Sequence, residues 1–187
     1  MASAVTACPS TARPIISKEG EETIAIKKKF PYKTAVVACN GGCRASKTPD
    51  AKCVYGCIGC EQCVIACKFG AISINDLGVA EVNEEKCIAC GKCATYCPQN
   101  LIHVHECANY IVVKCSNQDK GKDARGVCEV SCIGCGMCEK VCTASAIKVV
   151  NNVAVIDDAK CLSCGMCAVN CPRGAIIDTR GVLTAKY

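Results

Sequence analysis

Short stretches of alternating apolar and polar residues recur along the chain, with polar turn residues between them. AISIN and VAEVN flank Asp76–Gly78, and AIKVV and VAVID flank Asn151 and Asn152. Period-two alternation on both sides of a turn predicts two small β-hairpins. LIHVH and YIVVK, around residues 101–114, have the same character and predict strands that join two parts of the chain.

Four cysteine-rich runs lie between these strands. Each reads C-x2-C-x2-C-x3-C, and the four are CIGCEQCVIAC (57–67), CIACGKCATYC (87–97), CIGCGMCEKVC (132–142) and CLSCGMCAVNC (161–171). The second pair repeats the first at nearly the same spacing, and VVKCSNQ before it resembles VVACNGG before the first. The repeat predicts an N-terminal arm over 1–34, a first module over 35–110 and a second module over 111–187.

The runs themselves predict loops that lead into short helices, such as EQCVIAC and GKCATYC. Their glycines, in IGC and CGM, allow the backbone to bend close to a bound group. The segment SNQDKGKDARG (116–126) is polar and contains glycine, which predicts an exposed loop.

The cysteine content narrows the class of protein. The chain has 23 cysteines in 187 residues, which is typical of a disulfide scaffold or a metal protein. The N-terminus MASAVTACPSTARP lacks the pattern of a signal peptide, and no apolar run approaches the ~20 residues of a membrane helix. We therefore expect a soluble, cytoplasmic protein, in which dense cysteine indicates metal.

The hydrophobic core is expected to be weak. The apolar fraction of 51% counts the cysteines, and the chain has no Trp and only two Phe. Little large apolar surface is available for burial, so we expect bound metal to take part in holding the fold together.

The spacing of the runs resembles that of bacterial two-cluster ferredoxins, in which three thiolates of a run hold one cluster and the fourth holds the other. This predicts an α+β fold of two tandem dicluster ferredoxin modules, with small hairpins and short helices around four [4Fe–4S] clusters. The predicted ligand sets are Cys57, Cys60, Cys63 and Cys97; Cys87, Cys90, Cys93 and Cys67; Cys132, Cys135, Cys138 and Cys171; and Cys161, Cys164, Cys167 and Cys142. Pro98 and Pro172 follow two crossing cysteines as the motif prefers, whereas Lys68 and Thr143 follow the other two.

Three other interpretations compete with this one. Zinc in S4 sites suits C-x2-C pairs better than triplets with a crossing fourth thiol. A disulfide framework belongs to secreted chains. Cys53, Cys57 and Cys60 spell C-x3-C-x2-C, the signature of radical enzymes that use S-adenosylmethionine, but the chain is too short for the barrel of those enzymes.

Seven cysteines are left over: Cys8, Cys39, Cys43, Cys53, Cys107, Cys115 and Cys128. Cys39 and Cys53 recur as Cys115 and Cys128 in the second module, so each pair is expected to share one structural task. Buried thiols beside the clusters, a redox-sensitive disulfide in each module, and a further metal site using Cys39, Cys43 and Cys53 all remain open.

Charge argues against a nucleic-acid partner. The formal net charge is +5 with every thiol neutral. An oxidised cluster with four thiolates carries about −2, so four clusters bring the protein to about −3. Lys27–Lys29 form a short basic run expected to face solvent or a partner, and His103 and His105 are expected to be surface or interface residues on one side of a strand.

Longer stretches resemble one family in particular. AVVACNGGCRAS, YGCIGCEQCVIACKFGAI, VNEEKCIACGKCATYCPQNLI and VVKCSNQDKGKDARGVCEVSCIGCGMCEKVC follow in that order. Together they resemble the C-terminal polyferredoxin region of the B subunit of the Rnf complex, a membrane ferredoxin:NAD+ oxidoreductase. The resemblance covers about residues 35–175 and implies a chain of clusters that receives electrons from ferredoxin. We expect the family's membrane helix and separate N-terminal cluster domain to be absent here, so membrane anchoring is not carried over from the resemblance.

The sequence therefore predicts an electron-transfer subunit without a substrate site of its own. It contains no G-x-G-x-x-G, no Walker loop and no pairing of nucleophile and base. The expected partners are ferredoxin and an oxidoreductase subunit with a flavin, tungsten or molybdenum centre. The alternative is a free polyferredoxin carrier, although the N-terminal arm favours a fixed subunit. A zinc-holding interaction module is the remaining non-redox alternative.

Overall fold

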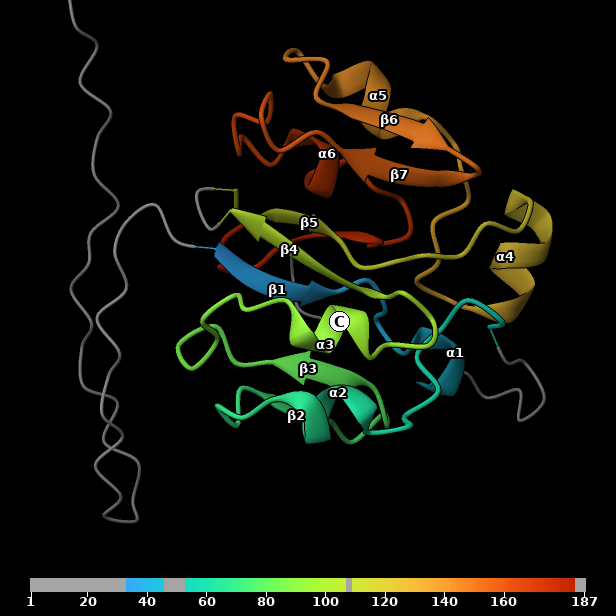
Figure 1. Cartoon of the computed structure of the whole chain (residues 1–187). Coiled ribbons are helices and arrows are strands. Elements are labelled where there is room, and N and C mark those ends of the chain that lie inside the picture. Colours follow the sequence, from blue (N-terminus) through green and yellow to red (C-terminus); the bar gives the residue numbers. More distant parts are fainter. Residues whose placement is uncertain (1–32, 46–52, 107–108, 184–187) are drawn as a thin grey trace, which may run out of the picture.

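The computed structural model describes residues 33–45, 53–106 and 109–183. Figure 1 shows an N-terminal half, residues 33–106, below a C-terminal half, residues 109–183. Most of the predicted N-terminal arm, including Lys27–Lys29, lies outside the described residues, as do Cys8 and Cys107.

Each half contains the β-hairpin that its alternating pattern predicts. In the N-terminal half, β2 (Ile72–Ile74) pairs antiparallel with β3 (Ala80–Val82), and the Asn75 side chain accepts hydrogen bonds from two backbone N–H groups of the turn. In the C-terminal half, β6 (Ile147–Val150) pairs with β7 (Val153–Ile156). Asn151 and Asn152 have φ values of 49° and 65°, the left-handed pair that a two-residue hairpin turn requires.

The outer strands close each half on itself. β1 (Lys33–Val37) pairs antiparallel with β4 (Ile102–Glu106), and β5 (Ile111–Val113) pairs with β8 (Ile176–Asp178). The prediction of strands around 101–114 is confirmed, but their role is different. β4 and β5 do not join the two parts to each other, because each hydrogen-bonds to a strand of its own half.

A short helix begins inside each cysteine run, as predicted. The four are α2 (Gln62–Ala66), α3 (Lys92–Thr95), α5 (Met137–Val141) and α6 (Met166–Val169). The residue before each helix is left-handed: Glu61, Gly91, Gly136 and Gly165 have φ between 58° and 75°. This left-handed residue turns the chain from the loop into the helix, and only Glu61 does so without being glycine.

Two further helices precede the first run of each half. α1 spans Gly42–Ala45 and α4 spans Gly121–Val127. The prediction of an exposed loop over 116–126 is wrong for α4 and for Asn117, whose side chain is buried. Ala124 is fully buried, and Ser131 Oγ donates hydrogen bonds to the carbonyls of Ala124 (2.8 Å) and Cys128 (2.9 Å). The helix is held in place by buried Ala124 and by buried Ser131, which follows it in the sequence. With a single buried alanine, the segment has no apolar periodicity from which a helix could be predicted.

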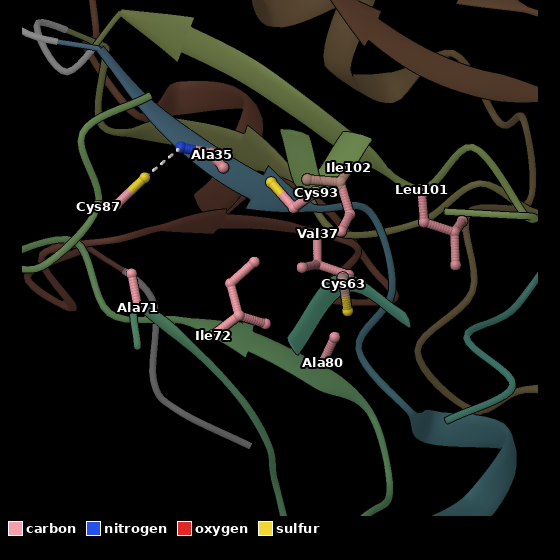
Figure 2. Close-up of a cluster of buried hydrophobic side chains, with 10 residues drawn as sticks. All are labelled: Ala35, Val37, Cys63, Ala71, Ile72, Ala80, Cys87, Cys93, Leu101 and Ile102. Carbon is pink, nitrogen blue, oxygen red and sulfur yellow. Dashed lines mark hydrogen bonds between the residues drawn. The ribbon is translucent and has the colours of Figure 1, made fainter. Parts of the chain in front are cut away.

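The core consists of one cluster of buried side chains in each half. Figure 2 shows that Cys63, Cys87 and Cys93 lie among the aliphatic side chains of the N-terminal cluster. Most of the other members are Ala, Val or Ile, so little apolar area is buried for each residue. The thin core agrees with the composition.

Candidate metal centres

Four hollows lie at the cysteine runs, and each is lined by four thiols. Every hollow contains the first three cysteines of one run and the last cysteine of the other run in the same half. The lining thiols are Cys57, Cys60, Cys63 and Cys97; Cys67, Cys87, Cys90 and Cys93; Cys132, Cys135, Cys138 and Cys171; and Cys142, Cys161, Cys164 and Cys167. The structure thus brings together the four thiols of each predicted set.

The crossing of the fourth thiol follows from the local backbone. In the first run, three cysteines lie on the loop and at the start of α2, and the helix then carries the chain away from that hollow. α2 packs against α3 and α5 packs against α6, so the end of each helix reaches its neighbour's loop. Cys67 and Cys142 therefore lie in the hollow of the next run.

The hollows fit a cluster in donor chemistry. The space between protein atoms, counted with the part open to solvent, is about 360, 330, 330 and 370 Å³, and thiols line each hollow. Within the described residues, no three His, Cys, Asp or Glu side chains converge on a point where they could hold a single metal ion. Four thiolates around a larger space are the donor set that a [4Fe–4S] cluster requires.

Backbone N–H groups donate hydrogen bonds to several of these sulfur atoms. Cys87 Sγ accepts from Ala35 N and Ala89 N, both at 3.4 Å, and Figure 2 shows the first of these bonds. The crossing cysteines accept from the residue four positions ahead, with N···S distances of 3.3 to 3.4 Å, in Cys67, Cys97 and Cys142. Hydrogen bonds to sulfur stabilise the thiolate form and tune the potential of a bound cluster.

Burial differs in a regular way along each run. The third cysteine is buried in all four runs, whereas the second is exposed: Cys60, Cys90, Cys135 and Cys164. Burial, with the charge of Cys132 or Cys161 as the next cause, raises the pKa of the Cys138 and Cys167 thiols to about 11. These thiols are protonated at neutral pH until a metal displaces the proton. The exposed second cysteine leaves one edge of each hollow at the surface.

The remaining candidate residues divide into two groups. Cys39, Cys43, Cys53, Cys115 and Cys128 are half-buried, and no disulfide is formed by any cysteine in the described part of the chain. His103 is exposed on β4, in agreement with the prediction. His105 is half-buried, and burial lowers the pKa of its imidazole. Its Nε2 atom is buried and has no hydrogen-bond partner among the described residues.

Comparison with known proteins identifies the class of protein. Residues 56–101 and 131–175 each match the 4Fe–4S dicluster domain. The two segments belong to the dicluster ferredoxin family, and two such domains imply two [4Fe–4S] clusters each, four in total. The predicted α+β fold of ferredoxin modules is confirmed.

The chain is homologous to the B subunits of Rnf-type complexes. It is 39% identical over 176 residues to the B subunit of the Na(+)-translocating ferredoxin:NAD(+) oxidoreductase complex of Acetobacterium woodii, covering 82% of this chain and 52% of the relative. It is 38% identical over 178 residues to the B subunit of the ion-translocating oxidoreductase complex of Methanosarcina acetivorans, covering 83% and 66%. The chain thus spans between half and two thirds of the length of these relatives.

A shorter segment of the chain is similar to a subunit of another kind of complex. Over 47 residues the chain is 45% identical to the polyferredoxin-like subunit of the aliphatic sulfonate oxidoreductase of Pyrococcus furiosus, covering 24% of this chain and 27% of the relative.

In the ranges that the structure describes, none of the helices has the length and apolar character needed to cross a bilayer.

Proposed function

We propose that the chain relays single electrons along four [4Fe–4S] clusters as a subunit of an oxidoreductase complex, between ferredoxin and the redox centre of a partner subunit. The observation that carries this proposal is the gathering of four thiols around each of four hollows. We assign each predicted set of four cysteines as the ligands of one cluster, and 35–110 and 111–187 as the two modules.

The crossing thiols give the relay its geometry. In each module the two runs exchange their fourth cysteines, so the helices that precede these cysteines tie the two sites together. A fixed separation between neighbouring clusters keeps the distance over which an electron must transfer constant. Backbone N–H···S bonds at Cys67, Cys97 and Cys142 set the electrostatic environment without any side-chain chemistry.

The surface beside the clusters suits a protein partner. Ile58, Ile88 and Leu162 each lie between two ligand cysteines of a run, and their side chains are exposed. An apolar rim around an exposed cluster edge favours close approach of a second protein over contact with a small polar substrate. We propose that this partner carries a flavin, tungsten or molybdenum centre and that the protein works in the cytoplasm without performing substrate chemistry itself.

The test is purification from the native host, untagged and without oxygen, through a sizing column. At least sixteen irons per chain, eluting together with an enzyme that contains a flavin or a metal centre, is the expected result. The same iron content in a small peak of this chain alone would contradict the subunit assignment and indicate a free carrier. A colourless zinc-containing protein would contradict the relay altogether.

A further inference from the structure

A fifth hollow lies between the two halves, away from the four ligand sets. It is lined by Cys39, Cys43 and Cys53 from the N-terminal half and by Cys115 and Cys128 from the C-terminal half. These are the five leftover cysteines that lie within the described residues. Counted with the part open to solvent, the hollow spans about 300 Å³, close to the 330 to 370 Å³ of the four hollows at the runs.

The two halves approach each other closely at this hollow. A Cβ atom at Gly42 would lie 2.9 Å from Cys128 Sγ and would overlap the side chain of Val130, so the glycine permits the close approach. Ser116 Oγ donates a hydrogen bond of 2.7 Å to the Tyr55 carbonyl across the same boundary. Figure 1 shows α1 and α4, which flank the hollow, at the same end of the molecule. Thiols from distant parts of the sequence therefore line one hollow.

Four of the five thiols have the hydrogen bonds of ligand cysteines. Each accepts a bond from the backbone N–H two residues ahead: Cys39 from Gly41, Cys53 from Tyr55, Cys115 from Asn117 and Cys128 from Val130. Cys87 and Cys161, which open two of the ligand runs, make the same bond with Ala89 and Ser163 at 3.4 Å. The same four thiols are the ones that recur between the halves, two from each.

Two of these thiols also accept hydrogen bonds from the cysteine runs that line the four hollows. Cys39 Sγ accepts from Cys57 N at 3.4 Å, and Cys115 Sγ accepts from Cys132 N at 3.2 Å. Cys57 and Cys132 are the first cysteines of the first and third runs. A group held by Cys39 and Cys115 would thus lie one hydrogen bond from a ligand of each module.

Cationic groups offset negative charge at this position. Lys114 lines the hollow and interacts electrostatically with Cys39. Arg173 donates a hydrogen bond of 2.7 Å from Nη2 to the Cys128 carbonyl, and its Nε is buried without a hydrogen-bond partner among the described residues. A half-buried lysine and a guanidinium close to the thiols that line the hollow favour an anionic occupant over a free cation.

We propose that this hollow binds a fifth [4Fe–4S] cluster, ligated by Cys39, Cys53, Cys115 and Cys128, which bridges the two halves and connects their cluster pairs. The four thiols lose their protons when the cluster binds, and Cys43 is a neighbour and not a ligand. The proposal adds to the four-cluster relay. The two can fail separately, because the relay requires sixteen irons and the fifth cluster requires four more.

The experiment counts iron and acid-labile sulfide in the full chain, purified without oxygen together with any native partner. Wild-type protein is expected to hold about twenty irons. Cys53→Ala and Cys128→Ala, one from each half, should each hold about sixteen, and the double variant should also hold about sixteen. This equality is expected only if both thiols serve the same cluster. After reduction, each single variant should lack one EPR signal that the wild type shows, and the missing signal should be the same in both variants.

Two matched variants separate ligation from packing. Cys43→Ala removes a thiol from the same hollow. Val130→Ala shortens an apolar side chain that lines the hollow and removes no thiol. Both variants should keep about twenty irons. Sixteen irons in the wild type would overturn the proposal, as would zinc or a disulfide at these cysteines. Loss of four irons from Cys43→Ala would overturn the ligand set. Fewer than sixteen irons in the wild type would instead count against the four-cluster relay.

Discussion

At the scale of single residues, the chemistry of the protein depends on the protonation and hydrogen bonding of sulfur. Buried thiols such as Cys138 and Cys167, with a pKa of about 11, cannot serve as thiolates at neutral pH by themselves. Metal binding must displace their protons, while N–H···S bonds compensate part of the charge that remains. Spacing along the chain groups the thiols that line each hollow, because three of every four belong to the same run.

The crossing assignment can be tested at Cys142. Cys142→Ala is expected to remove the cluster of Cys161, Cys164 and Cys167 and to leave the cluster of Cys132 and Cys135 intact, because Cys142 lies in the fourth hollow. The double variant Cys142→Ala with Cys164→Ala should lose about four irons, no more than either single variant.

The matched control for this test pairs Cys142→Ala with Cys135→Ala. This double variant should lose about eight irons, because two different clusters are affected. Loss of only four irons from the control pair, measured together with acid-labile sulfide, would show that Cys142 serves the cluster beside it in sequence.

The raised thiol pKa values predict a pH dependence of cluster assembly. A thiol below its pKa gains thiolate about tenfold for each pH unit, so iron uptake by the apoprotein should accelerate from about pH 7 to about pH 9. If protonated thiols were the form that binds iron, the rate of iron uptake would instead fall as the pH rises. The measurement is the initial rate of absorbance gain during anaerobic reconstitution, with loaded protein at each pH as the control. A rate that does not change over this range would contradict the prediction.

At the scale of elements, the cysteine loops are shaped by left-handed residues at fixed positions. Glu61, Gly91, Gly136 and Gly165 occupy the same position before their helices, all with positive φ. Sequence patterns predicted these helices and the hairpins because each is closed by neighbouring residues. Helix α4 escaped prediction because Ala124 is its only buried side chain, and its anchor, Ser131, lies outside it.

Glu61 provides a test of strain in these loops. Its φ of 58° is unfavourable for a residue with a Cβ atom, so Glu61→Gly is expected to stabilise the loaded protein by up to about 1 kcal/mol. Glu61→Ala keeps the backbone strain and removes only the exposed carboxylate, and it should be close to neutral. Denaturant midpoints followed by cluster absorbance without oxygen provide the comparison. Equal midpoints for the glycine and alanine variants would contradict strain at this position.

At the scale of the whole molecule, the clusters reverse the sign of the net charge. The polypeptide carries a formal +5, and each cluster with its thiolates adds about −2, so the loaded protein is acidic. At pH 7 the loaded protein should bind an anion exchanger, and the apoprotein should bind a cation exchanger. Elution of both forms from the same resin at the same salt concentration would contradict this reversal. Loaded Cys53→Ala, with one cluster fewer, should elute from the anion exchanger at lower salt than the wild type.

Spacing along the chain was enough to predict the modules' hairpins, their short helices and four sets of thiols, because a cysteine loop and its helix are formed by a few successive residues. The partner of each outer strand depends on folding at longer range, and β4 and β5 turned out to pair within their own halves. The gathering of Cys39, Cys43, Cys53, Cys115 and Cys128 at one boundary depends on how the two halves pack. Recurrence marked four of these thiols as related, but only contact between residues some 60 to 90 positions apart in the chain brings them to one hollow, and no local pattern encodes that contact.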